Sequence, residues 1–110
     1  MKTIVILFLL MQTSAAFASY NCKLKVKNNR VNLDSDFVFD GNNTINTTLG
    51  DFRFRIFKAT QSTGEETYTI SISHSYGAST TIFTPGSKLV AHAINSGEPG
   101  AIVQAVCRKL

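Results

Sequence analysis

The residues of this chain that could support covalent or acid–base chemistry are few and lie far apart in the sequence. The only two histidines, His74 and His92, each share an expected strand face with apolar residues. A zinc site would need a third or fourth ligand at a recognisable spacing, and none accompanies them. We therefore expect both histidines to be structural or partly exposed, and we expect no metal site and no cofactor.

The tripeptide Ser73-His74-Ser75 places serines next to a histidine, which is the pair of residue types that nucleophilic catalysis uses. Neighbours on one strand point to opposite faces of a sheet, so we do not expect His74 to activate either serine. The chain contains neither Gly-x-Ser-x-Gly nor His-Glu-x-x-His. We predict no catalytic residue and expect that the chain is not an enzyme.

Residues 1–18 have the pattern of a bacterial-type secretory signal. Lys2 precedes an apolar run at 4–11, and Ala16-Phe17-Ala18 has the A-x-A form of a cleavage site. The apolar run is too short for a membrane span, which needs about 20 residues. We expect cleavage between Ala18 and Ser19. Residues 19–110 would then form a single β-domain, periplasmic or secreted, with no membrane span.

The two cysteines, Cys22 and Cys107, bracket the predicted domain. In an oxidising compartment such a pair is most simply one disulfide. A bond that closes so long a loop stabilises a fold by about 4–5 kcal/mol in the chain-entropy model. We expect it to link the first and last strands, which would lie either beside each other or across the core.

The rest of the domain alternates polar and apolar residues with a period of two, and no stretch shows a helical period. Short turn motifs separate the alternating stretches. We predict strands at 20–27, 30–39, 45–49, 52–56, 67–76, 80–84, 88–94 and 101–107. Gly50 lies where the parity of the pattern changes and indicates a bulge or tight turn. The prediction is an all-β fold, either a small antiparallel sandwich or a closed barrel of about seven or eight strands.

The first two predicted strands suggest a specific register. The pair Asn28-Asn29 tolerates positive φ and suits a two-residue hairpin turn. That turn would pair Leu24 with Leu33 on the buried face and Lys23 with Asp34 on the solvent-exposed face.

Exposed basic residues form rows on two predicted strands: Lys23, Lys25 and Lys27 on one, Arg53 and Arg55 on another. The neighbouring aromatic residues alternate onto the buried faces, so a stacking platform for nucleic acid is not expected. The composition, with only 16% charged residues, is also a poor fit to a nucleic-acid-binding arm or a coiled coil. We expect no nucleic-acid partner.

Three segments, Tyr20-Asn21-Cys22, Phe37-Val38-Phe39-Asp40 and the terminal Cys107, resemble the periplasmic inhibitors of animal-type lysozyme. Those inhibitors are exported β-barrels of similar size that begin with a Tyr-x-Cys element. The family's central aromatic segment has no counterpart, because this chain has no Trp. None of the family's inhibitory residues therefore carries over, and the resemblance is one instance of what a small exported β-domain can do.

We expect a non-catalytic binding or inhibitor-like module, with an unknown protein or a cell-envelope ligand as partner. This role suits an exported β-domain that is held by a disulfide and carries varied loops. The alternative is a structural or assembly subunit of the cell envelope that associates through a strand edge.

Overall fold

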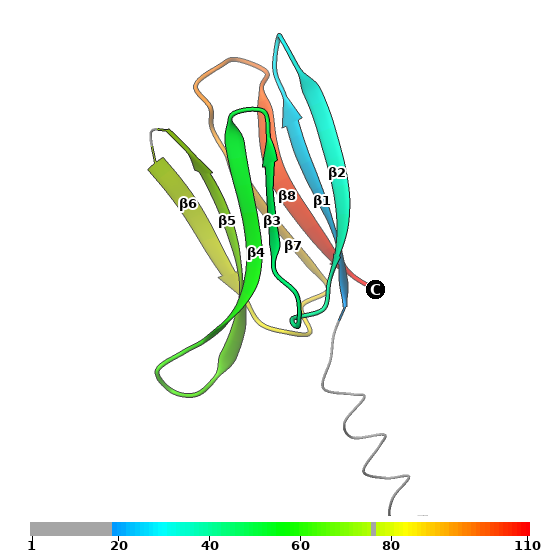
Figure 1. Ribbon diagram of the computed structural model, residues 1–110, viewed down its shortest axis with the longest axis vertical. Coiled ribbons are helices and arrows are strands. Elements are labelled where there is room, and N and C mark those ends of the chain that lie inside the picture. Colours follow the sequence, from blue (N-terminus) through cyan, green and yellow to red (C-terminus); the bar gives the residue numbers. More distant parts are fainter. Residues whose placement is uncertain (1–18, 76) are drawn as a thin grey trace, which may run out of the picture.

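The computed structural model describes residues 19–75 and 77–110, which form eight β-strands in two antiparallel sheets packed face to face (Figure 1). The strands are β1 Tyr20–Lys27, β2 Asn32–Phe39, β3 Ile45–Leu49, β4 Phe52–Thr60, β5 Glu66–His74, β6 Gly77–Phe83, β7 Leu89–Ile94 and β8 Ile102–Lys109. The predicted signal segment, residues 1–18, lies outside the described residues, and so does Ala18 of the predicted cleavage site.

Each sheet has four strands and two edges. Sheet A has the order β2-β1-β8-β7 and sheet B has the order β3-β4-β5-β6. The chain changes sheets between β2 and β3 along one side of the molecule, and between β6 and β7 along the other. Because both sheets end in unpaired edges, the fold is a sandwich. Of the two predicted architectures the closed barrel is wrong, and the all-β antiparallel class is confirmed.

The predicted disulfide is present and joins the two central strands of sheet A. Cys22 of β1 and Cys107 of β8 lie directly opposite each other, with their Cα atoms 4.0 Å apart. The sequence left open whether these strands lie side by side or across the core, and they lie side by side. Both cysteine side chains are fully buried.

The inward face of every central strand follows the predicted alternation. In β1 these residues are Tyr20, Cys22, Leu24 and Val26, all buried. The end of the core nearest the chain termini is filled by aromatic rings in edge-to-face contact, in the range of separations where such pairs are stabilising. These rings are Tyr20, Phe39, Tyr68 and Phe83.

This aromatic cluster also ties the core to a loop. The hydroxyl of Tyr20 accepts a hydrogen bond of 2.9 Å from the backbone N–H of Gly86, between β6 and β7. Burial raises the pKa of the Tyr68 hydroxyl, and the neighbouring Tyr20 adds to the shift. The sandwich is therefore closed at this end by packed aromatic rings, and the Tyr20 hydroxyl links them to the β6–β7 loop.

The predicted turn between β1 and β2 is wrong by one residue. Asn29 and Arg30 form the loop, and the backbone N–H of Asn28 donates to the carbonyl oxygen of Val31 at 2.9 Å. The Oδ1 atom of Asn28 accepts hydrogen bonds from the N–H groups of Arg30 and Val31. No non-glycine residue in the described part of the chain has a positive φ. The turn is thus held by the Asn28 side chain rather than by left-handed backbone at Asn29.

Moving the turn by one residue shifts the strand pairing by two. Leu24 lies opposite Ser35, and Lys23 lies opposite Asp36 rather than Asp34. Because side chains alternate with a period of two, a shift of two residues keeps every side chain on its predicted face. The predicted faces are confirmed and the predicted register is not.

Two other turns can be compared with the prediction. At Gly50 the parity change is produced by a tight turn, with Leu49 paired to Phe52 and Gly50 at φ +59°. This is a primed hairpin turn, whose first central position favours glycine. The turn after β5 is shorter than predicted, since β6 begins at Gly77 and not at Thr80.

Replacing both cysteines by alanine should lower the melting temperature by roughly 10 °C or more, because the unfolded chain regains the entropy of a loop that joins residues 85 positions apart. Differential scanning calorimetry measures the shift. Thiol titration of the native protein should find no free thiol, and two thiols per chain would contradict the bond.

Asn28→Ala should destabilise the domain by about 1 kcal/mol, because two backbone N–H groups lose their acceptor. Asn29→Gly should bring no stabilisation, since position 29 does not need positive φ. Urea unfolding of the two variants tests the turn. Stabilisation by Asn29→Gly together with a silent Asn28→Ala would instead support the turn centred on Asn28-Asn29.

Leu24→Ala should cost about 2–5 kcal/mol, because Leu24 is 1% exposed and its loss leaves a cavity. Lys23→Ala, one residue away on the solvent-exposed face, should lower the free energy of unfolding by less than about 1 kcal/mol. The two unfolding free energies are compared by denaturant titration, and equal costs would show that β1 is not half-buried.

Candidate functional site

Four loops meet at the end of the sandwich that is opposite to the described chain termini (Figure 1). They are the connections β1–β2, β3–β4, β5–β6 and β7–β8. Because each of these pairs is an antiparallel hairpin whose first strand runs toward this end, all four turns come together there. We call this the loop end of the molecule.

A cleft of about 530 Å³ opens between these loops, and we call it the loop-end cleft. All four connections contribute to its lining, and most of the contributed side chains are polar. The lining residues are Asn28, Arg30, Asp51, Phe52, His74, Ser75, Asn95, Ser96 and Glu98. The cleft is therefore built by residues that are distant in the sequence and adjacent only in the folded sandwich.

The apolar part of the cleft is small and well packed. Phe52, the first residue of β4, is almost fully buried, and its ring meets the imidazole of His74 edge to face at a centroid distance of 5.5 Å. These rings come from neighbouring strands of sheet B. They close the core beneath the loops, so that a ligand in the cleft would contact polar groups above a rigid base.

Two asparagines brace the loops on either side. Asn28 holds the β1–β2 turn as described, and Oδ1 of Asn95 accepts a hydrogen bond of 2.8 Å from the N–H of Gly97. Farther along the β7–β8 loop, the N–H of Ala101 donates to the carbonyl oxygen of Glu98. The asparagine bonds run from side chain to backbone and the Ala101 bond runs between backbone groups, and together they hold the loops without a regular element.

Charged groups of both signs line the cleft. Arg30 and Asp51 are exposed, whereas Glu98 is half-buried. Between the residues that the structure describes, the one ion pair joins Lys58 and Glu66, on strands away from the cleft. The guanidinium and the two carboxylates of the cleft are therefore not engaged in ion pairs with other described residues.

The structure places the two histidines in different settings. His74 lines the loop-end cleft together with two carboxylate side chains, Asp51 and Glu98. His92 lies on the inward face of β7, half-buried, and its Nε2 atom is buried without a hydrogen-bond partner among the described residues. In residues 19–75 and 77–110, no cluster of three or more His, Cys, Asp or Glu side chains could hold a metal ion.

Ser75 and His74 do not face opposite sides of a strand, as the alternation predicts for neighbours, because both line the cleft. The reason is that β5 ends at His74, so Ser75 belongs to the turn and no longer follows the alternation of the sheet. Arg30, Asp51 and Glu98 were not predicted as site residues. The sequence does hold a signal for them: they lie in the first, third and seventh connections, and in a meander of antiparallel strands alternate connections lie at the same end.

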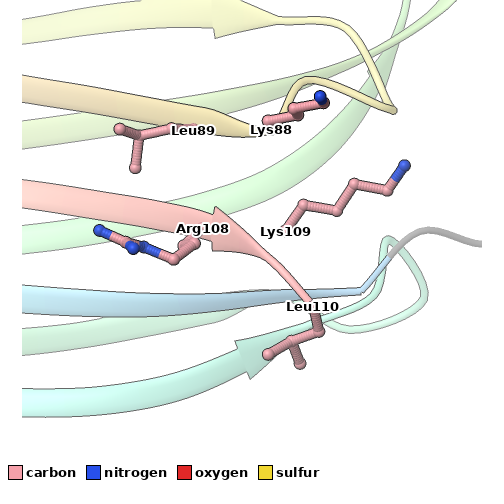
Figure 2. Close-up of a pocket in the computed structure, with 5 residues that line it drawn as sticks. All are labelled: Lys88, Leu89, Arg108, Lys109 and Leu110. Carbon is pink, nitrogen blue, oxygen red and sulfur yellow. The ribbon is translucent and has the colours of Figure 1, made fainter.

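A second hollow, of about 380 Å³, lies near the opposite end of sheet A, where β7 begins and β8 ends. It is lined by Lys88, Leu89, Arg108, Lys109 and Leu110. Figure 2 shows that the cationic groups diverge: Arg108 extends back along the strands, while Lys88 and Lys109 extend beyond the strand ends. Charges that point apart do not converge on one anion, so this hollow is the weaker candidate.

The basic rows predicted from the sequence lie on opposite outer surfaces. Lys23, Lys25 and Lys27 are on the outer face of sheet A, where Asp36 and Asp34 lie opposite the first two. Arg53 and Arg55 are on the outer face of sheet B, and the Arg55 guanidinium lies 5.0 Å from the ring centroid of Phe57. The two rows therefore do not combine into one basic surface.

In the part of the chain that the structure describes, there is no helix of the length and apolar character that crossing a membrane requires. No family model matches the chain, and no match was found among curated proteins or solved structures.

Proposed function

We propose that this chain is a non-catalytic binding module, exported to the periplasm or the cell exterior, and that the loop-end cleft is its binding site. The observation that carries the proposal is the convergence of four loops on one cleft of about 530 Å³. Recognition sites on β-sandwiches commonly lie on loops at one end of a rigid scaffold. The volume lies within the range of small-ligand pockets, about 300–1,000 Å³.

The chemistry of the lining favours a polar ligand. Asn95 and Ser96 are exposed there and offer an amide and a hydroxyl group, while Asp51 and Glu98 offer carboxylate acceptors. Arg30 adds a single forked donor. The two carboxylates outnumber the single guanidinium. The best-matched partner is therefore a protein or cell-envelope ligand that presents hydrogen-bond donors or a cationic group.

The disulfide supports the exported location. A bond between buried Cys22 and Cys107 is compatible with an oxidising compartment, where such bonds persist. The signal pattern of residues 1–18 adds the route by which the chain would reach it.

Catalysis is the less favoured role for the same cleft. His74 shares it with two carboxylates and with Ser75, which are residue types that hydrolytic enzymes use. Asp51 and Ser75, however, are exposed to solvent in short turns. Catalytic groups are typically held in sites that exclude water, where their interactions are strengthened. A ligand site explains the open, solvated lining more simply.

The second candidate is a structural or assembly subunit of the cell envelope. It is supported by apolar side chains exposed on the outer face of sheet A, namely Val38, Leu89 and Ile102. An assembly subunit would form open-ended oligomers that grow with concentration. Light scattering of the mature protein detects that growth, whereas a binding module would remain small.

The binding role is tested with a matched pair of variants. Ser96→Arg places a long charged side chain in the cleft, and Ser62→Arg places the same side chain in the β4–β5 loop at the other end of the molecule. Both serines are exposed, so both variants should keep the parent melting temperature to within about 2 °C.

With the mature domain as bait for envelope and culture-medium fractions, Ser96→Arg should lose the captured ligand and Ser62→Arg should retain it. NMR shift perturbations by that ligand should map to the cleft-lining residues. Equal capture by both variants, or shifts confined to another surface, would show that the loop-end cleft is not the binding site.

A further inference from the structure

Strand β7, Leu89–Ile94, is an edge of sheet A that carries none of the usual protection against pairing. It has no charged residue and no proline, and the side chain of Leu89 is 55% exposed. The other edge of the same sheet, β2, carries Asp34 and Asp36. Natural proteins place charges, prolines or bulges on edges to prevent association. The edges of sheet B, β3 and β6, are also uncharged but rich in Asn, Ser and Thr, so β7 is the most apolar of the uncharged edges.

The hydrogen bonds of β7 show which backbone groups are available at that edge. The N–H of Lys109 donates to the carbonyl oxygen of Lys88, which identifies these two residues as a hydrogen-bonded pair. Such pairs alternate along an antiparallel ladder, so Val90 and His92 also bond to β8. The N–H and C=O groups of Leu89, Ala91 and Ala93 therefore point away from β8, toward the open edge.

We propose that β7 pairs with β7 of a second copy of this chain, antiparallel and around a two-fold axis at Ala91. In that register Ala91 lies opposite Ala91 of the partner subunit, and Leu89 lies opposite Ala93 of the partner subunit. Each outward-pointing residue then exchanges both of its backbone hydrogen bonds with its opposite number. The two copies of sheet A form one continuous sheet.

The side chains favour a second copy as the occupant. The smallest pair, alanine with alanine, lies at the two-fold axis, where each residue faces its own symmetry mate. Leucine lies opposite alanine on either side of the axis, and β7 has no charged residue that would face a like charge. An interface of this kind is self-complementary, as two-fold symmetry requires.

The second sheet does not oppose this approach. Strand β6, the edge of sheet B on the same side of the sandwich, also has no charged residue. Two copies can therefore come together along both edges without juxtaposing like charges. The pairing closes on itself, so it ends at a dimer rather than an open polymer. It is independent of the binding role proposed for the loop-end cleft.

Sedimentation velocity of the mature protein, from micromolar to millimolar concentration, should show a reversible monomer–dimer equilibrium with no larger species. Ala91→Lys and Ala91→Glu should each raise the dissociation constant by at least about tenfold, because each puts like charges directly opposite one another at the axis. An equimolar mixture of the two variants should regain the dimer, since lysine then faces glutamate.

Neither variant should change the fold, because Ala91 is exposed and its N–H does not bond to β8. Circular dichroism and the melting temperature check this. Thr48→Lys, an exposed change on the edge strand β3 at the other side of the molecule, is the matched control and should leave the dimer intact. A parent protein that stays monomeric, an association that Ala91→Lys does not weaken, or a mixture that fails to recover it would overturn the proposal.

Discussion

The pairing of β1 with β8 is the contact on which the rest of the sandwich depends. Sheet B is a meander of four consecutive strands, so local hairpins are enough to build it. Sheet A consists of one hairpin from each end of the chain, β1–β2 and β7–β8, and only the β1–β8 ladder joins them. The Cys22–Cys107 bond crosses that ladder, and it therefore secures the one long-range strand pairing that sheet A cannot do without.

The sequence predicted faces much better than it predicted register. Alternation along β1 identified Leu24 and Val26 as core residues, because burying one face of a strand constrains every second side chain. The same alternation does not distinguish two registers that differ by two residues. The choice between a turn at Asn28-Asn29 and one at Asn29-Arg30 depended on the Asn28 side chain. Its side chain offers an acceptor to two N–H groups, and that local bond outweighed the general preference of Asn-Asn for primed turns.

The candidate site was less predictable than the fold, for a related reason. No window of sequence contains the loop-end cleft, because its lining comes from four turns that meet only after the hairpins stack. His74 was singled out by residue type, but its neighbours Asp51 and Glu98 become neighbours through topology. The aromatic cluster closes the opposite end of the core, so the two ends of one sandwich differ in character although both are made of short connections.

The position of the disulfide also decides how the domain responds to tension. Strands β1 and β8 run antiparallel, and the N–H of Leu110 bonds to the carbonyl oxygen of Ser19, so a force on residues 19 and 110 would peel the two strands apart from that end. Peeling stops at Cys22 and Cys107, after an extension of roughly 20 Å. From there the force passes through the S–S bond, and the loop of chain between the two cysteines lies outside the path of the load. With the disulfide intact, the domain extends very little under load. With the disulfide reduced, the whole domain can unfold and extend by on the order of 300 Å.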